Sequence, residues 1–279
     1  MSTLYKYVAN PSVAENFLEG SIKFSPIREL NDPSELTSNV IYEKVVQSLR
    51  RLRRDGYDED DLLHLRRQEA VLRALAPEFQ AVGAPASVED ANRLIRSPFY
   101  DQTQELDRLL QQTTEVISRK VGVFCLSKRA DSLPMWAHYG GNATGFVVEL
   151  NGLDEVFRGD ETGVLWVPTE VRYQRDTGGV TFEPRSHDAI FFEKFSDWSY
   201  EQEVRVIAPL DSCKQVPTNP GILYLYDLPK HVIVRLILGW NIDEDVARRI
   251  EESAANSSRV QVVRAKIDQG RVITEAQDR

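Results

Sequence analysis

The hydrophobic pattern of the chain changes twice along its length, and this limits the folds that the chain can adopt. Residues 1–40 combine short apolar strands with one helix that Ser12 is expected to cap, whereas residues 40–119 carry apolar side chains at helical spacing. From residue 120 onward short strands predominate, with one amphipathic helix over 243–255. Strands and helices do not alternate as they would in a doubly wound parallel sheet. The sequence therefore predicts an α+β fold with a mixed or antiparallel β core.

The helical region between residues 40 and 119 is expected to be an insertion within a single domain that spans residues 1–279. Its charged side chains gather in two runs, Arg50, Arg51, Arg53 and Arg54, then Asp55, Asp58, Glu59, Asp60 and Asp61. Such runs are typical of solvated helix faces. The alternative is a lid, or a surface for a partner or a second subunit, whose apolar face would include Leu106, Leu109 and Leu110.

The composition excludes several classes of protein. The formal net charge is -9, from 43 acidic and 34 basic residues, which argues against broad, non-specific nucleic-acid binding but leaves room for a local basic groove. With 2 cysteines and scattered histidines, neither a disulfide framework nor a metal site is expected. The N-terminus lacks the pattern of a signal peptide, and no apolar stretch is long enough to span a membrane. We expect a cytoplasmic protein without a membrane partner.

The segment 200–208 alternates strongly and is predicted to be a core strand. Alternation would place Glu201, Glu203 and Arg205 on one face of that strand. Burying two carboxylates and a guanidinium without partners would be costly. These side chains therefore either line a functional cleft or form cross-strand ion pairs on an exposed sheet face. The segments 164–167 and 171–173 are predicted to form a hairpin around Pro168.

A second polar segment runs from Cys125 to Tyr139 and is predicted to be a strand, a loop and a short helix. Ser132 is expected to cap the helix, and Gly140 or Gly141 to end it. The cysteine lies in an apolar strand and is interpreted as a small buried hydrophobic residue rather than a nucleophile. Ser127, at the end of the strand, is better placed to bond a ligand.

Three aromatic side chains crowd the predicted short helix, namely Trp136, His138 and Tyr139. Such a cluster can plug a core or form a platform for a planar ligand. The alternative to a ligand contact is a position in the core for Trp136 and a structural hydrogen bond for His138.

Several of these motifs, taken together, resemble a bacterial family that is known only as a domain of unknown function. They are Leu4-Tyr5-Lys6-Tyr7, Leu30-Asn31-Asp32-Pro33, Cys125-Leu126-Ser127, Met135-Trp136-Ala137-His138-Tyr139 and Trp198-x-x-Glu201-x-Glu203-x-Arg205. The resemblance covers most of the chain outside the helical insertion and names no activity.

The order of the polar residues also resembles ADP-ribosyltransferases of the arginine-serine-glutamate type. This resemblance implies a split-sheet fold with NAD as substrate, bound by an early strand (Tyr5, Lys6, Tyr7), a serine motif (Ser127) and a late Glu-x-Glu pair. Glu203 would then bond the ribose and stabilise the oxocarbenium ion, and Glu201 would orient or deprotonate the acceptor. Ser127 would support Glu203, and Tyr139 or Trp136 would stack on nicotinamide.

The sequence departs from the transferase pattern in three places. Lys6 stands where that family has an arginine or histidine, the serine motif reads Cys-Leu-Ser, and Arg205 would neutralise a carboxylate. The resemblance implies a small nucleotide ligand, a protein or nucleic-acid acceptor, and a role in toxicity or phage defence. An NAD or nucleotide hydrolase that uses the same cleft, and a non-catalytic partner-binding module, remain alternatives.

Overall fold

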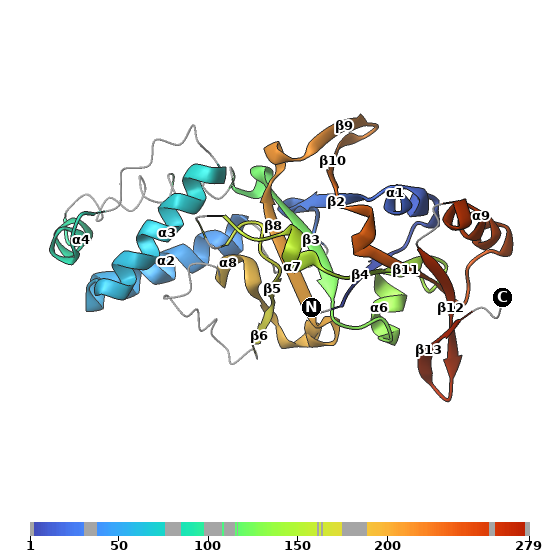
Figure 1. Ribbon diagram of the computed structural model, residues 1–279. Coiled ribbons are helices and arrows are strands. Elements are labelled where there is room, and N and C mark those ends of the chain that lie inside the picture. Colours follow the sequence, from blue (N-terminus) through green and yellow to red (C-terminus); the bar gives the residue numbers. More distant parts are fainter. Residues whose placement is uncertain are drawn as a thin grey trace.

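The computed structural model describes residues 3–30, 38–75, 85–97, 108, 115, 117–160, 162, 164–174, 189–256 and 260–276. They form a mixed sheet of 11 strands, with a group of helices projecting beyond one end (Figure 1). Within this sheet the paired strands are antiparallel, except β11 and β12, which are parallel. The α+β fold with a mixed, mostly antiparallel sheet is therefore confirmed.

The strands of the sheet follow the order β13-β12-β11-β4-β1-β3-β2-β10-β9, and β8 and β5 continue it on the other edge of β3. Their bounds are Leu4–Val8 (β1), Ser21–Pro26 (β2), Val121–Ser127 (β3), Phe146–Leu150 (β4), Thr169–Glu170 (β5), Glu203–Pro209 (β8), Lys214–Thr218 (β9), Gly221–Asp227 (β10), Ile233–Leu238 (β11), Gln261–Asp268 (β12) and Arg271–Ala276 (β13). A separate parallel pair is formed by β6 (Arg172–Gln174) and β7 (Glu193–Phe195).

The sheet divides at β3. One edge of this strand pairs along its whole length with β8, which puts Ser127 opposite Glu203. The other edge pairs with β2 at Gly122 and Val123, but with β1 only at Ser127. Between these contacts, residues 124–126 face no described strand on that edge, because β1 and β2 diverge. The sheet thus has a fork, which opens along one edge of β3.

Apolar side chains cover both faces of the sheet. On one face, Phe124 and Val206 belong to a core cluster with residues of α1 (Ala14–Leu18) and α9 (Glu244–Asn256). The opposite face carries two clusters, one around Ile207 and the other around Tyr7 with residues of α6 (Leu133–His138). Because directly opposite residues of paired strands share a face, Cys125, Ser127, Glu203 and Arg205 lie on this second face with Ile207.

Local signals explain the short helices. Ser132 caps α6 as predicted, accepting a hydrogen bond from Met135 N at 3.5 Å, and Pro134 occupies its first turn. At the first helix the predicted cap was wrong, because Asn10 accepts the hydrogen bond from Ser12 N at 3.0 Å. A 3₁₀ turn over Pro11–Val13 then leads into α1. The remaining short helices are α7 (Leu153–Val156) and α8 (Ala189–Phe192).

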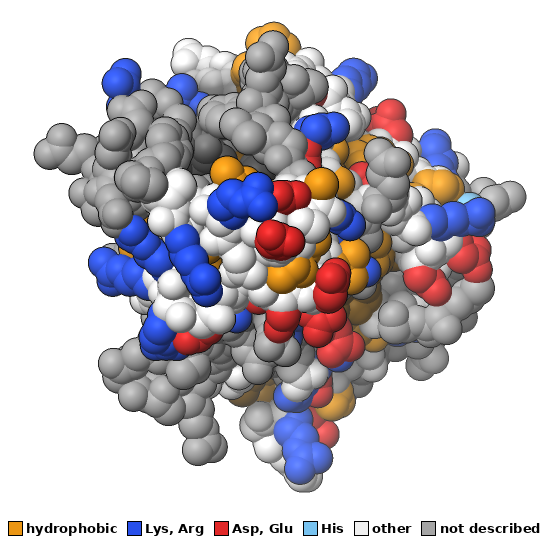
Figure 2. All heavy atoms as spheres, turned by 90° about the vertical axis from the view of Figure 1, so that its left-hand side faces the viewer, with side chains coloured by type: hydrophobic (Ala, Val, Ile, Leu, Met, Phe, Trp, Pro, Cys, Tyr) orange, Lys and Arg blue, Asp and Glu red, His pale blue; other side chains and the backbone are white. Residues whose placement is uncertain are grey.

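Between β2 and β3 the described residues include the helices α2 (Ser38–Asp55), α3 (Glu59–Leu75) and α4 (Val88–Ile95). They project from the sheet in Figure 1 and face the viewer in Figure 2, where basic and acidic side chains both occur. Of the two predicted charge runs, all members are exposed except Arg51 and Asp61, which form an ion pair with each other. The runs are thus mainly solvated helix faces, as the first interpretation held.

One predicted hairpin does not form, and one observed hairpin was not predicted. No hairpin forms around Pro168, because β5 pairs with β8 while β6 pairs with β7. The hairpin of β9 and β10 was missed, although Asn219-Pro220-Gly221 is a turn sequence between its strands. Asn31-Asp32-Pro33, a sequence typical of a turn, and the apolar face of Leu106, Leu109 and Leu110 lie outside the described residues. Among the helices that are described, none combines the length and the apolar character needed to cross a membrane.

We predict that Gly145→Ala destabilises the fold strongly. A β-carbon at this position would lie 2.0 Å from the carbonyl oxygen of Val8, a backbone atom that β1 holds in place against β4. The expected loss in unfolding free energy, measured by urea denaturation, is at least about 3 kcal/mol. Gly270→Ala is the control, since its φ is +77° but nothing lies within 4 Å of the added carbon. It should cost only about 1 kcal/mol, and equal losses would contradict the steric argument.

Candidate functional site

A cavity of about 170 Å³ lies at the fork of the sheet. Its walls come from β1, β2, β3, β7, β8 and the segment around α6. Lys6 reaches into the fork from β1, and its Nζ donates a hydrogen bond of 3.0 Å to the carbonyl oxygen of Cys125. This carbonyl lies on the edge of β3 that neither β1 nor β2 covers. The lysine thus replaces the strand partner that the divergence of β1 and β2 removes.

The two glutamates reach the cavity across a turn rather than along a strand. The predicted strand 200–208 begins only at Glu203, whereas Glu201 ends a 3₁₀ helix over Ser196–Glu201. Gln202 between them has the left-handed conformation, with φ 43°. The hydroxyl of Ser127 donates a hydrogen bond of 2.6 Å to the carbonyl oxygen of Glu201 and so fixes this turn. Both carboxylates line the cavity despite the error in the predicted strand boundary.

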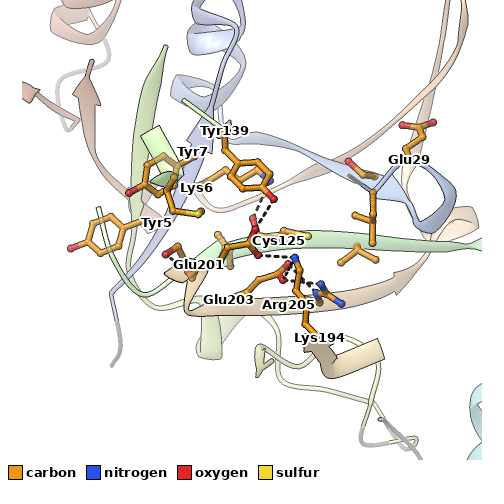
Figure 3. A pocket seen from close by; sticks show the side chains of 16 residues that line it. Tyr5, Lys6, Tyr7, Glu29, Cys125, Tyr139, Lys194, Glu201, Glu203 and Arg205 are labelled. Carbon is orange, nitrogen blue, oxygen red and sulfur yellow. Dashed lines mark hydrogen bonds and ion pairs between the residues drawn. The ribbon is translucent and has the colours of Figure 1, made fainter. Parts of the chain in front are cut away.

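One lysine, which the sequence analysis missed, joins the two carboxylates. The Nζ of Lys194 on β7 lies 2.7 Å from Glu201 Oε2 and 3.4 Å from Glu203 Oε2. Its ammonium also lies 4.8 Å from the ring centroid of Trp198. Figure 3 shows Lys194 and the two carboxylates pointing toward one another. The sequence signal was a lysine four residues before a tryptophan, beside an apolar pair, but nothing in that pattern indicated which carboxylates it would meet.

Arg205 completes the charged cluster. It donates two hydrogen bonds to the Glu203 carboxylate, from Nε at 2.9 Å and from Nη2 at 2.7 Å, and a third from Nη1 to the carbonyl oxygen of Phe191 at 2.8 Å. Only 1% of the arginine is exposed, and 5% of Glu203. The two cations balance the two carboxylates, which is the condition under which charges can be buried at tolerable cost.

The environment separates the two carboxylates electrostatically. Burial alone would raise the pKa of Glu203, but Arg205 and Lys194 oppose it and lower that pKa to about 2. For Glu201 burial dominates, and its pKa is raised although Lys194 and a hydrogen bond of 2.6 Å from the hydroxyl of Tyr139 favour the charged form. Glu203 is therefore a fixed negative charge, while Glu201 is the carboxylate more ready to take up a proton.

The early strand contributes Tyr5, Lys6 and Tyr7 to the lining of the cavity. Tyr7 is buried, and its hydroxyl donates a hydrogen bond of 3.0 Å to the carbonyl oxygen of Arg129, which fixes the ring in place. Burial lowers the pKa of the Lys6 amine. Ser127 is fully buried and acts on the Glu201 main chain, not on the Glu203 carboxylate that the transferase resemblance assigned to it.

Two of the expected ligand-binding residues lie outside the cavity. Trp136 is fully buried, donates its Nε1 hydrogen to the carbonyl oxygen of Ala130 at 2.8 Å, and packs against Tyr7 and Trp240. Its ring cannot stack on a ligand there, so the core interpretation holds. His138 is exposed, and its Nδ1 lies 2.9 Å from the Tyr200 hydroxyl. Neither residue lines the cavity, whereas Tyr139 does.

Cys125 is only partly buried and lines the cavity. Burial, followed by the neighbouring Glu203 carboxylate, raises the pKa of its thiol. A protonated thiol is a poor nucleophile, so Cys125 shapes the cavity wall. Within the described residues, no three His, Cys, Asp or Glu side chains gather closely enough to hold a metal ion.

We predict that Arg205→Met lowers the unfolding free energy by about 3 to 5 kcal/mol at pH 7, because it leaves the buried Glu203 carboxylate without its bidentate partner. Urea denaturation measures the loss. Arg264→Met is the matched control, since Arg264 makes a similar bidentate contact with Glu244, whose side chain is 72% exposed. That exposed pair should contribute less than about 1 kcal/mol. Similar losses in the two variants would contradict a special role for burial.

The lowered pKa of Glu203 predicts a pH dependence of stability. A carboxyl whose pKa is lower in the folded state stabilises the fold above its unfolded value near 4.5, and this contribution is lost as the pH falls toward about 2. The shift corresponds to about 3 kcal/mol. Glu203→Gln should show a smaller loss of stability than the wild type between pH 5 and about 2 in the same denaturation measurements. If the unfolding free energies of the wild type and Glu203→Gln changed with pH in the same way, the fold would not be keeping Glu203 ionised.

Comparison with known proteins bears on the segment that builds this site. No curated protein and no solved structure gives a significant match to the chain. The sequence model of one family, described as "Protein of unknown function (DUF2971)", matches residues 135–206. This segment begins in α6 and ends just after Arg205, so it includes Tyr139, Lys194 and both glutamates. The expected resemblance to a domain of unknown function is confirmed there, and over residues 135–206 the chain is similar to this family of unknown function.

Proposed function

We propose that the protein is an enzyme that cleaves the N-glycosidic bond of NAD and transfers ADP-ribose to a protein or nucleic-acid acceptor. The observation that carries this proposal is the pair of buried carboxylates in one cavity, Glu201 and Glu203, which share Lys194 and have pKa values shifted in opposite directions. Two carboxyls that differ in this way can divide the roles of acid or base and of fixed charge.

Glu203 would act where positive charge develops. As the bond between the ribose C1′ and the nicotinamide nitrogen breaks, its electron pair leaves with nicotinamide and the ribose becomes an oxocarbenium ion. A carboxylate that stays ionised and is held rigidly by Arg205 stabilises that ion without having to reorganise. This is the part of the reaction that a fixed charge serves best.

Glu201 would act on the acceptor. A nucleophilic oxygen or nitrogen of the acceptor forms the new bond to C1′, and its proton passes to the Glu201 carboxylate. A raised pKa brings this carboxyl closer to the working pH, which favours its use as a general base. Tyr139 and Lys194 hold the side chain through one oxygen each.

One observation favours a second candidate, a non-catalytic partner-binding module. Both oxygens of Glu203 already accept hydrogen bonds from Arg205, which a purely structural ion network would also require. The same cavity could also serve a hydrolase, with water in place of the acceptor. Nicotinamide release distinguishes catalysis from binding, and the fate of ADP-ribose distinguishes transfer from hydrolysis.

We predict that Glu203→Gln lowers the rate of nicotinamide release from NAD by about 100-fold or more, because it removes the charge opposite the oxocarbenium ion. Glu201→Gln should lower transfer by about 100-fold or more, and wild-type transfer should rise with pH as Glu201 loses its proton. Chromatography of nicotinamide and mass analysis of the acceptor give both rates. Free ADP-ribose as the main product would identify a hydrolase.

The control for these variants is Glu244→Gln, which changes an exposed glutamate on α9 outside the cavity. Its rates should match those of the wild type. A wild-type protein that neither binds NAD in a calorimetric titration nor releases nicotinamide with any acceptor would overturn the proposal and favour the binding module.

A further inference from the structure

A row of polar residues leads away from the cavity across the sheet. The strand registers place six residues opposite one another on six neighbouring strands, in the order Glu203, Ser127, Tyr5, Glu149, Arg235 and Gln261. Directly opposite residues share a face, so the row lies on the face that carries the cavity. Its first three members line the cavity, while Gln261 at its far end is exposed. The row is thus a polar path from the buried carboxylates to solvent.

A β-bulge puts Arg235 into this row. Ile233 pairs with Leu150 and Arg235 with the adjacent Glu149, so Val234 is an extra residue in β11. Ile233 and Leu236 consequently belong to the same core cluster although they are three residues apart. Without the extra residue, regular alternation would turn Arg235 toward the face that holds Ile233. Bulges of this kind re-aim side chains and are frequent beside functional sites.

The guanidinium of Arg235 is held less closely than those of Arg205 and Arg264. Its Nη1 lies 3.5 Å from Glu149 Oε2, beyond the usual length of a charge-assisted hydrogen bond. Its Nε is buried and has no hydrogen-bond partner among the described residues. Arg205 and Arg264 instead make close bidentate contacts. A buried donor without a partner is costly unless a ligand completes it.

The size of the cavity requires that a dinucleotide extend beyond it. Sites for whole small molecules usually exceed roughly 300 Å³, whereas this cavity measures about 170 Å³. Tyr5 connects the two regions, because it lines the cavity and lies opposite Glu149 in the row. In Figure 3 the phenol of Tyr5 points away from the two carboxylates. The part of a ligand that leaves the cavity along this row would pass Glu149 and then reach Arg235.

We propose that Arg235 forms a phosphate-binding subsite that takes the pyrophosphate of the ligand whose other end occupies the cavity. A guanidinium can bond two phosphate oxygens in its fork geometry, and a rotation of this partly exposed side chain would bring its buried, unpaired Nε toward the ligand. Glu149 lies beside it and opposes an anion, so it limits the affinity of the subsite. The identity of the ligand as NAD rests on the proposed function, but the subsite can be tested without it.

The first test uses inorganic pyrophosphate as the probe in calorimetric titrations of the full chain. Arg235→Gln should weaken binding by at least about tenfold, as expected for the loss of a charged hydrogen-bond partner. Glu149→Gln should tighten binding several-fold, because it removes the opposing charge. Arg264→Gln, which changes a half-buried arginine on the neighbouring strand, should leave binding unchanged. Thermal unfolding of each variant, together with Arg235→Lys, which keeps the charge, shows whether the fold has survived.

The second test compares NAD with nicotinamide riboside, which lacks phosphate. Arg235→Gln should weaken NAD binding by at least about tenfold and leave nicotinamide riboside binding unchanged. Equal binding of pyrophosphate by wild type and Arg235→Gln, or no binding by the wild type, would overturn the subsite. If pyrophosphate binds through Arg235 but NAD is neither bound nor cleaved, the subsite stands and the proposed reaction fails. If NAD is cleaved equally well by Arg235→Gln at limiting NAD, the reaction stands and the subsite fails.

Discussion

The shared ammonium group of Lys194 is the interaction on which the candidate site depends. Two carboxylates in one small cavity repel each other, and burial makes each of them costly to ionise. The lysine pairs with both carboxylates, and Arg205 pairs with Glu203 as well. These cations allow both carboxylates to remain in the interior. The arrangement also explains why the two differ. Glu203 has an arginine of its own, whereas Glu201 has only the shared lysine and a tyrosine hydroxyl.

The fork of the sheet provides the space for this cluster. Because β1 and β2 separate along β3, the apolar layer on that face is interrupted, with one cluster around Ile207 and another around Tyr7. The charged side chains occupy the gap between the two clusters. The topology and the chemistry of the site are therefore consequences of the same divergence of strands.

Much of this arrangement could be predicted from local pattern, and the remainder depended on contacts distant in sequence. The strands at 4–8 and 146–150 follow from their short apolar and aromatic runs, and the helix after Ser132 follows from its capping residue. The pairing of Glu201 with Glu203 was predicted as well, but on the wrong geometry, since the left-handed Gln202 carries no distinctive sequence signal. Lys194 was missed because its partners lie on other elements. Trp136 was instead expected among the ligand-binding residues but lies in the core, because an aromatic cluster in sequence does not reveal which ring faces the core.

Lys6 shows how a sheet can stay open without leaving a backbone group unsatisfied. A hydrogen bond between two backbones holds paired strands at a fixed separation. The flexible side chain of Lys6 instead donates to the Cys125 carbonyl from β1, which no longer pairs with β3 at this point. The amine carries more than one hydrogen, so it can donate to the carbonyl and to an incoming anion at once. A ligand that enters the fork would therefore meet a donor that is already in position.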